Sequence, residues 1–238
     1  MPIPATFHNG KKTFTVLENN PEVMNALAKK LGLSPDLAFY DVYSLTDPGL
    51  LSIIPRPVHA LLVILPLTPS WNNSRLAEDT PLSVYEGSGR DEPVIWFKQT
   101  IGHACGSIGL LHCLINGPTK NFILPDTTLS RLQEQALPLK MEERAKLLYD
   151  DKEFEDAHQS VAEMGDTAAP TFVKGNDGHL WELEGSRKGP LDRGFLADNE
   201  DVLSENAIAK GIGGVIRMEE EAGGGDLRFS CIALAKAG

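Results

Sequence analysis

Apolar residues recur along the chain with two different spacings, and these spacings assign much of it to short helices and strands. Val23, Leu27 and Leu31 repeat at helical spacing behind Asn20-Pro21, a pair typical of a helix start. Helical spacing predicts further helices at residues 105–116, 128–137, 141–149 and 202–220. Alternation or short apolar runs predict strands at residues 37–45, 58–65, 171–174, 179–183 and 227–234. Helices and strands in this arrangement predict an α+β fold.

Turn residues and polar stretches complete this outline. Gly175-Asn-Asp-Gly178 separates two of the predicted strands and indicates a β-hairpin. Residues 68–93 are polar, and residues 150–166 are acidic with few apolar side chains, so we expect both to be surface loops. Because no repeat and no linker-like segment divides the sequence, we expect a single domain over residues 1–238.

The charge balance narrows the class of partner. The chain carries 22 Lys and Arg against 33 Asp and Glu, a formal net charge of −11. Binding of nucleic acid needs a basic stripe, so we expect none. The acidity favours a basic protein or peptide through electrostatic complementarity, while the simpler explanation, that the charge keeps the protein soluble, stays open.

Cysteine usage and the length of the apolar runs limit the other classes. The chain has three cysteines (Cys105, Cys113 and Cys231), an odd number without C-x-x-C spacing, so we expect a reducing compartment, no metal and no cofactor. The longest apolar run, residues 60–65, is far shorter than the ~20 residues that cross a bilayer. The N-terminus has no basic segment followed by an apolar one. We therefore expect a cytoplasmic monomer that does not bind membranes, with a nuclear location also open.

Cys105 is the side chain with the most chemical promise. It begins a predicted helix between Ala104 and Gly106, and a helix N-terminus stabilises a thiolate through its unpaired N–H groups and dipole. The small neighbours allow a substrate carbonyl to approach. Gln99, six residues upstream, can donate its amide to an oxyanion. Taken alone, Cys105 is equally well explained as one more buried cysteine.

The segment around this cysteine, Lys98-Gln-Thr-Ile-x-x-Ala-Cys-Gly-x-Ile-Gly-Leu-x-His112, resembles the nucleophile segment of the ubiquitin carboxyl-terminal hydrolases, which are papain-like cysteine peptidases. Other similar segments follow the family order over nearly the whole chain: Asn20-Pro-Glu-Val, Leu31-Gly-Leu, Asp41-Val-Tyr43, Leu50-Leu-Ser-x-x-Pro-Arg-Pro57, Asp177-Gly-His-Leu-x-Glu-Leu183 and Leu227-Arg-Phe-x-x-Ile-Ala-Leu234. The resemblance implies a papain-like fold with a central, mostly antiparallel sheet flanked by helices.

The resemblance also implies roles for three residues. Cys105 is the expected nucleophile and Gln99 the expected oxyanion-hole donor. The orienting acid, usually an aspartate, falls on Glu184, which has the same charge and one more methylene. His103 stands where the family commonly has asparagine.

The general-base histidine of the family has no counterpart in this sequence. Its register falls on Ala169, followed by Pro170, and the crossover loop before it is shorter than in the family. We interpret this as an internal deletion before Thr171. A misread exon boundary, a splice form and a degenerate enzyme all remain possible origins. A shortened strand that begins at Pro170 loses ladder hydrogen bonds and apolar burial, so we expect a weakened core beside the active site.

The remaining histidines are poor substitutes. His112 lies on the helix of Cys105 but ~10 Å along its axis, too far for a hydrogen bond. His179 and Glu184 are five residues apart in an alternating strand and point to opposite faces. His103 adjoins the nucleophile and is the least implausible stand-in. His8 and His59 have no motif around them, and for all six histidines, including His158, we expect structural or solvated roles.

The expected activity is thiol-dependent hydrolysis at the C-terminal glycine of ubiquitin, with ubiquitin as the partner and small adducts or short peptides as leaving groups. The crossover loop, residues 150–167, is expected to cover the cleft and limit the size of the leaving group. Two alternatives stay open. One is a ubiquitin-binding pseudoenzyme without turnover, and the other is the product of a faulty gene model.

Overall fold

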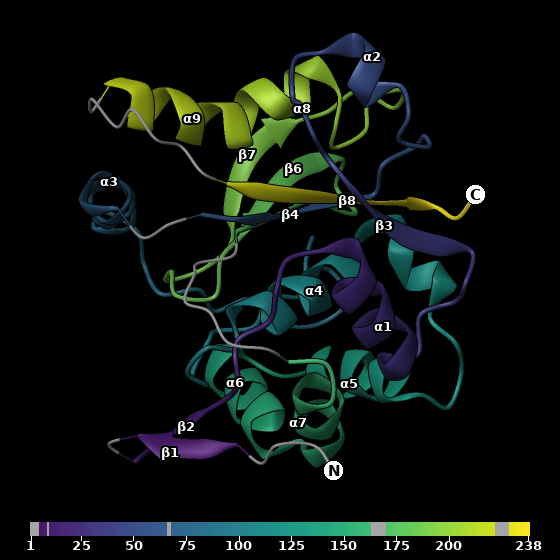
Figure 1. Cartoon of the computed structure of the whole chain (residues 1–238). Helices are drawn as coiled ribbons and strands as arrows, with labels where there is room; N and C mark the ends of the chain where they lie inside the picture. Colours follow the sequence, from purple (N-terminus) through teal and green to yellow (C-terminus); the bar gives the residue numbers. More distant parts are fainter. Residues whose placement is uncertain (1–4, 9, 66–67, 163–169, 222–228) are drawn as a thin grey trace.

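One six-stranded sheet organises the computed structural model, which describes residues 5–8, 10–65, 68–162, 170–221 and 229–238 (Figure 1). Its strand order is β3-β8-β4-β5-β6-β7, and every pair of neighbours is antiparallel. The strands are β3 Leu37–Asp41, β4 Ala60–Ile64, β5 Thr171–Lys174, β6 His179–Leu183, β7 Leu191–Phe195 and β8 Ser230–Lys236. A separate hairpin, β1 Thr6–His8 and β2 Lys11–Thr13, precedes it.

Helices cover both faces of the sheet (Figure 1). The first face carries α1 Pro21–Leu31, α4 Cys105–Ile115, the 3-10 helix Gly117–Phe122, α5 Thr128–Ala136, α6 Met141–Asp150 and α7 Lys152–Gln159. The second carries α2 Pro48–Leu51, α8 Glu205–Lys210 and α9 Ile212–Glu221, with α3 Pro69–Asp79 at the side. Strand β4 supplies both apolar cores, since Leu62 belongs to the first and Leu61 and Val63 to the second. This alternation explains why the strand reads as a continuous apolar run.

Helix α4 lies at the centre of the first face, and all of its eleven residues are buried. A helix that is apolar on every side must be surrounded by other elements, and α4 packs on β4 and β5, with α1 beside it. Thr171 of β5 also donates its hydroxyl to the carbonyl of Gly109, 3.2 Å away. The N-terminal end of α4, where Cys105 lies, is therefore fixed by the core.

The predicted α+β fold and most of the predicted elements are confirmed, but both expected loops contain helices. Residues 68–93 include α3, which Thr68 caps by accepting from the N–H of Trp71. Residues 150–166 include α7, which Asp151 caps by accepting from the N–H of Phe154. Capping and burial of a few apolar side chains outweigh the polar composition of both segments.

Two other expectations are refined by the backbone. The helix predicted over 202–220 is two helices, because the chain turns at Gly211, with φ −95° and ψ −111°. Strand β5 begins at Thr171 and pairs with β4 over three residues, while β4 pairs with β8 over five. The N–H of Val63 bonds to the carbonyl of Pro170, which continues the β4–β5 contact by one hydrogen bond. The weakened core that we expect beside the shortened strand β5 stays a prediction, which unfolding measurements in solution would test.

Across the described part of the chain, no helix combines the length and apolarity needed to cross a membrane.

Candidate active site

Cys105 is the first residue of α4, and its side chain is almost completely buried, with 9% of its surface exposed. The first N–H groups of the helix point toward the end where the thiol lies. Ala104, the residue at the cap position, makes no side-chain hydrogen bond to them. This arrangement stabilises negative charge at the N-terminus of the helix. It is the position expected of an activated cysteine.

The turn into Cys105 requires a left-handed residue. His103 has φ of 56°, a region that asparagine and histidine enter more readily than most residues. This geometry gives a backbone reason for the family's asparagine at this position and for the histidine that replaces it here. The side chain of His103 is exposed.

The segment before this turn is held by the N-terminal strand. The N–H of Gly102 bonds to the carbonyl of Lys12 over 2.8 Å, and the N–H of Phe14 bonds to the carbonyl of Gly102 over 2.9 Å. A Cβ at Gly102 would lie 2.7 Å from the Oγ1 of Thr13, so the close approach needs glycine. Backbone bonds on both sides of Gly102 thus position the residues that lead to the thiol.

Gln99 and the predicted acid segment meet through glycine as well. The N–H of Gln99 donates to the carbonyl of Gly185 over 2.7 Å. A Cβ at Gly185 would lie 2.8 Å from the Cβ of Gln99 and 3.2 Å from its nitrogen. The structure therefore brings Gln99, six residues before Cys105 in the chain, against the residue that follows Glu184.

The carboxylate of Glu184 is buried, with 3% of the residue exposed, and it is already engaged. Its Oε1 accepts from the N–H of Ser186 at 2.9 Å and from the hydroxyl of Ser186 at 2.7 Å. Its Oε2 lies 3.4 Å from the guanidinium of Arg75, which also bonds to Ser186. Arg75 comes from α3, a helix in a segment that we expected to be a loop. The pair Thr68-Pro69, typical of a helix start, is the sequence signal that indicates this helix.

Two histidines have structural roles that exclude them as bases. His112 is fully buried, its Nε2 accepts from the N–H of Phe97 at 3.0 Å, and burial lowers its pKa to about 3. His158 is also fully buried, its Nε2 lies 2.5 Å from the carbonyl of Thr15, and burial lowers its pKa to about 4. Each has its imidazole committed to holding one backbone segment.

The other histidines lie on different elements. His179 of β6 contacts the carboxylate of Asp192 at 2.8 Å. His59 precedes β4, and burial lowers its pKa. His8 lies in the hairpin strand β1. Ala169, where the register of the missing base falls, lies outside the described residues.

No group of three or more His, Cys, Asp or Glu side chains within the described ranges has an arrangement that could hold a metal ion.

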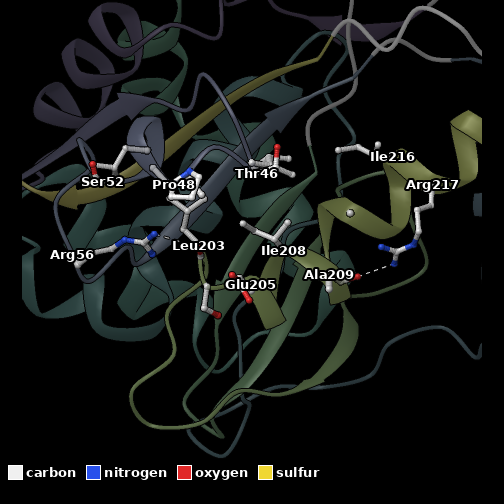
Figure 2. Close-up of a pocket in the computed structure, with 15 residues that line it drawn as sticks. Thr46, Pro48, Ser52, Arg56, Leu203, Glu205, Ile208, Ala209, Ile216 and Arg217 are labelled. Carbon is white, nitrogen blue, oxygen red and sulfur yellow. Dashed lines mark hydrogen bonds between the residues drawn. The ribbon is translucent and has the colours of Figure 1, made fainter.

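An open cavity lies on the other face of the sheet (Figure 2). It has a volume of about 900 Å³ between the segment around α2 and helices α8 and α9. Pro48, Leu203, Ile208 and Ile216 contribute to its mainly apolar wall. Because the sheet separates this cavity from α4, it does not belong to the site of Cys105.

Comparison with known proteins places this geometry in context. Residues 14–217 match the sequence model described as "Ubiquitin carboxyl-terminal hydrolase, family 1". Ubiquitin carboxyl-terminal hydrolase 3 of Arabidopsis thaliana is 34% identical over 240 residues, covering 98% of each chain. The isozyme L1 of Homo sapiens is 35% identical over 228 residues, covering 93% of this chain and 97% of the relative.

Among solved structures, the catalytic domain of Trichinella spiralis UCH37, bound to ubiquitin vinyl methyl ester, superimposes with a TM-score of 0.72 at 19% identity. The match covers 95% of this chain and 96% of that domain. At this identity the likeness supports the fold alone, and it agrees with the antiparallel sheet and flanking helices described above.

Proposed function

Because this chain belongs to family 1 of the ubiquitin carboxyl-terminal hydrolases, which are cysteine-type deubiquitinases, we propose that it binds the C-terminal tail of ubiquitin and presents Cys105 to its last glycine. The observation that carries the proposal is the buried thiol at the N-terminus of α4 with Gln99 fixed beside the acid segment. The solved relative bound to a ubiquitin ester supports ubiquitin as the partner.

The chemistry follows from these positions. The thiolate of Cys105 attacks the glycine carbonyl, and the amide of Gln99 with a backbone N–H donates to the oxyanion. The carbon–nitrogen or carbon–oxygen bond breaks, and the leaving group takes a proton. Water then attacks the thioester, which releases ubiquitin with a free carboxylate and restores the thiol.

The proton transfers are the steps for which this chain lacks an identified base. They need a base within hydrogen-bond reach of the thiol, and His112 and His158 are committed elsewhere. The carboxylate of Glu184 is bonded to Ser186 and Arg75. We therefore propose that Cys105 forms an adduct with electrophilic ubiquitin but hydrolyses ubiquitin esters and amides slowly. In the limiting case the chain is a ubiquitin-binding pseudoenzyme.

The crossover segment supports a preference for small leaving groups. Helix α7 is bound to the N-terminal strand by the ion pair of Lys12 and Glu155, at 2.6 Å, and by the bond from the N–H of Thr15 to Gln159, at 2.9 Å. Because these contacts anchor α7 on the face of the sheet that carries α4, we propose that it limits the space for a large folded leaving group.

Labelling with ubiquitin vinyl methyl ester and hydrolysis of a ubiquitin C-terminal ester separate these steps. We expect stoichiometric labelling of the wild type, no labelling of Cys105→Ala, and normal labelling of Cys113→Ala, whose thiol is buried in the core. Hydrolysis should be slow, and His103→Ala tests whether the histidine beside the thiol supplies the base activity that remains. Rapid hydrolysis that survives His103→Ala would disprove the missing base, and absence of both ubiquitin binding and labelling would disprove the proposed function.

The transcript is the complementary test. Sequencing across the codons for Ala169–Thr171 would reveal extra codons if the deletion is an error of the gene model or one splice form. A transcript that encodes the present sequence would support a true loss.

A further inference from the structure

A second cavity lies between α3, the β6–β7 region and the start of α9, away from Cys105 and beside the arginine that contacts Glu184. Its volume is about 200 Å³. The side chains that matter for the argument are Trp71, Arg75, Arg187, Arg193 and Lys210, all of which line it. Helices α3 and α9 pack on each other at this point, so three elements distant in sequence enclose it.

Two buried donors of this cavity have no acceptor. Trp71 is 3% exposed and Arg187 is 2% exposed. The indole N–H of Trp71 and the Nε–H of Arg187 each lack a hydrogen-bond partner within the described part of the chain. Buried N–H groups are almost always paired in native proteins, by protein, water or ligand. Two orphan donors on one small cavity indicate that an acceptor fills it.

The charges of the wall favour a negatively charged acceptor. Four cationic side chains line the cavity, whereas Glu78 is the only carboxylate among its lining residues. The other acids of the cluster bind the same guanidinium groups: Asp79 pairs with Arg187 at 2.8 Å, and Glu182 pairs with Arg193 at 2.5 Å. Glu78 itself pairs with Arg187 at 2.8 Å and with Arg193 at 2.5 Å, so these guanidinium groups are balanced by carboxylates. The ion pairs of the described residues do not include Lys210, which is therefore the lining cation left for a negatively charged acceptor.

The start of α9 adds to this polarity. Gly211, which precedes this ten-residue helix, and Gly214, in its first turn, line the cavity without side chains. A helix N-terminus carries partial positive charge and favours anions. A Cβ at Gly214 would have only the guanidinium of Arg217 within 4 Å, at 3.9 Å, so the backbone on this side is open.

We propose that this cavity binds one small tetrahedral oxyanion of the phosphate type. Phosphate offers several acceptor oxygens, so one ion can serve more than one donor, and the indole of Trp71 and the guanidinium of Arg187 each have an unpaired N–H among the residues that line this cavity. The volume suits an inorganic ion, because pockets for organic ligands and cofactors are larger, about 300–1,000 Å³. Lys210, whose ammonium donates to the carbonyl of Phe195 at 2.6 Å, retains two further donors for the ion.

Thermal unfolding of the full chain in inorganic phosphate, at ionic strength held constant with sodium chloride, tests the proposal. We expect a saturable rise in Tm, about 3–5 °C at ten times the dissociation constant. The rise should be strongly reduced in Lys210→Met and in Trp71→Phe. Lys146→Met is the matched control, because Lys146 is an exposed lysine on α6, and it should keep the full rise.

Two results would overturn the proposal. One is a Tm that does not depend on phosphate at constant ionic strength, which would mean that water fills the cavity. The other is an equal rise in the wild type and in Lys210→Met, which would place the ion elsewhere. If Trp71→Phe does not fold, Lys210→Met and Arg193→Met decide the matter. No ubiquitin enters the measurement, so its outcome is independent of the proposed hydrolase function.

Discussion

Residues 94–105, which we term the nucleophile arm, and residues 182–187, which we term the acid arm, meet at the active site but are held in different ways. Trp96, Phe97 and Ile101 of the nucleophile arm are fully buried apolar side chains, and backbone bonds complete its contacts. The acid arm is held by buried charges, among which Glu182 and Arg187 are 0% and 2% exposed.

The difference indicates that the acid arm is the half of the site whose arrangement depends more on the partners of its charged groups. Apolar burial fixes the backbone of Gln99 and Cys105 without depending on how neighbouring charged groups are paired. Buried ion pairs are selective, because each carboxylate that binds an arginine is no longer available to another group. Glu184 illustrates this, since its oxygens are bonded to Ser186 and Arg75.

The largest effect is expected from Arg187→Met in the acid arm. Arg187 pairs with Asp79 and Glu182, and both acids are buried. Leaving these charges unpaired should lower the free energy of unfolding by about 3–5 kcal/mol, measured by urea denaturation. The exposed Lys146→Met is the control and should change it by less than about 0.5 kcal/mol. A loss below about 1 kcal/mol for Arg187→Met would remove the contrast between the two arms.

A pH-dependent effect is expected on the nucleophile side from His158, which ties α7 to the strand bonded to Gly102. Its pKa in the folded protein is about 4, below the ordinary value of 6.5, because burial disfavours the charged form. The unfolded chain therefore binds more protons between these values. The stability contribution is complete above pH 6.5 and is lost as the pH falls toward 4, by up to about 3 kcal/mol.

His158→Gln keeps an N–H donor for Thr15 but does not titrate. Its free energy of unfolding should fall less than that of the wild type between pH 7 and pH 4.5. Lys12, Glu155 and the buried His112 are present in both proteins, so the difference isolates His158. Parallel pH curves for the two proteins would show that His158 is not the group responsible.

A smaller effect is expected where the two arms touch. Gly185→Ala would place a methyl group 2.8 Å from the Cβ of Gln99 and shift this proposed oxyanion donor. We expect labelling by ubiquitin vinyl methyl ester to slow by about tenfold or more, since loss of one such donor costs about 10²–10³ in rate. Gly238→Ala, where the nearest atom to a new Cβ lies 4.0 Å away, is the control. Unchanged labelling of Gly185→Ala would show that Gln99 tolerates displacement.

The smallest effect is expected from Glu184→Gln. If the carboxylate serves Ser186 and Arg75 rather than a base, the pH midpoint for alkylation of Cys105 by iodoacetamide should not move. Ser186→Ala, which removes the hydroxyl that bonds Glu184, is the companion variant and should also leave it unchanged. A clear shift with Glu184→Gln would restore Glu184 to the orienting role that the family resemblance implies.

The sequence by itself determined the family and the order of most elements, and it predicts the nucleophile segment. Cys105 and Gln99 lie in a local motif, and α1 carries its own start and stop signals, Asn20-Pro21 and Gly32. Local backbone preferences and side-chain periodicity are properties of short stretches, so they can be read without a fold.

Only the tertiary structure decided which residues surround Glu184 and which histidines are held in structural hydrogen bonds. Arg75 reaches Glu184 from a helix that looked like a loop, and His158 is locked by a carbonyl 143 residues away in the chain. The cavity of Trp71 and Arg187 likewise joins three elements that share no local pattern. Such contacts depend on how distant segments pack and which charges they bury together. The spacing of residues along one stretch of chain indicates neither how distant segments pack nor which charges they bury.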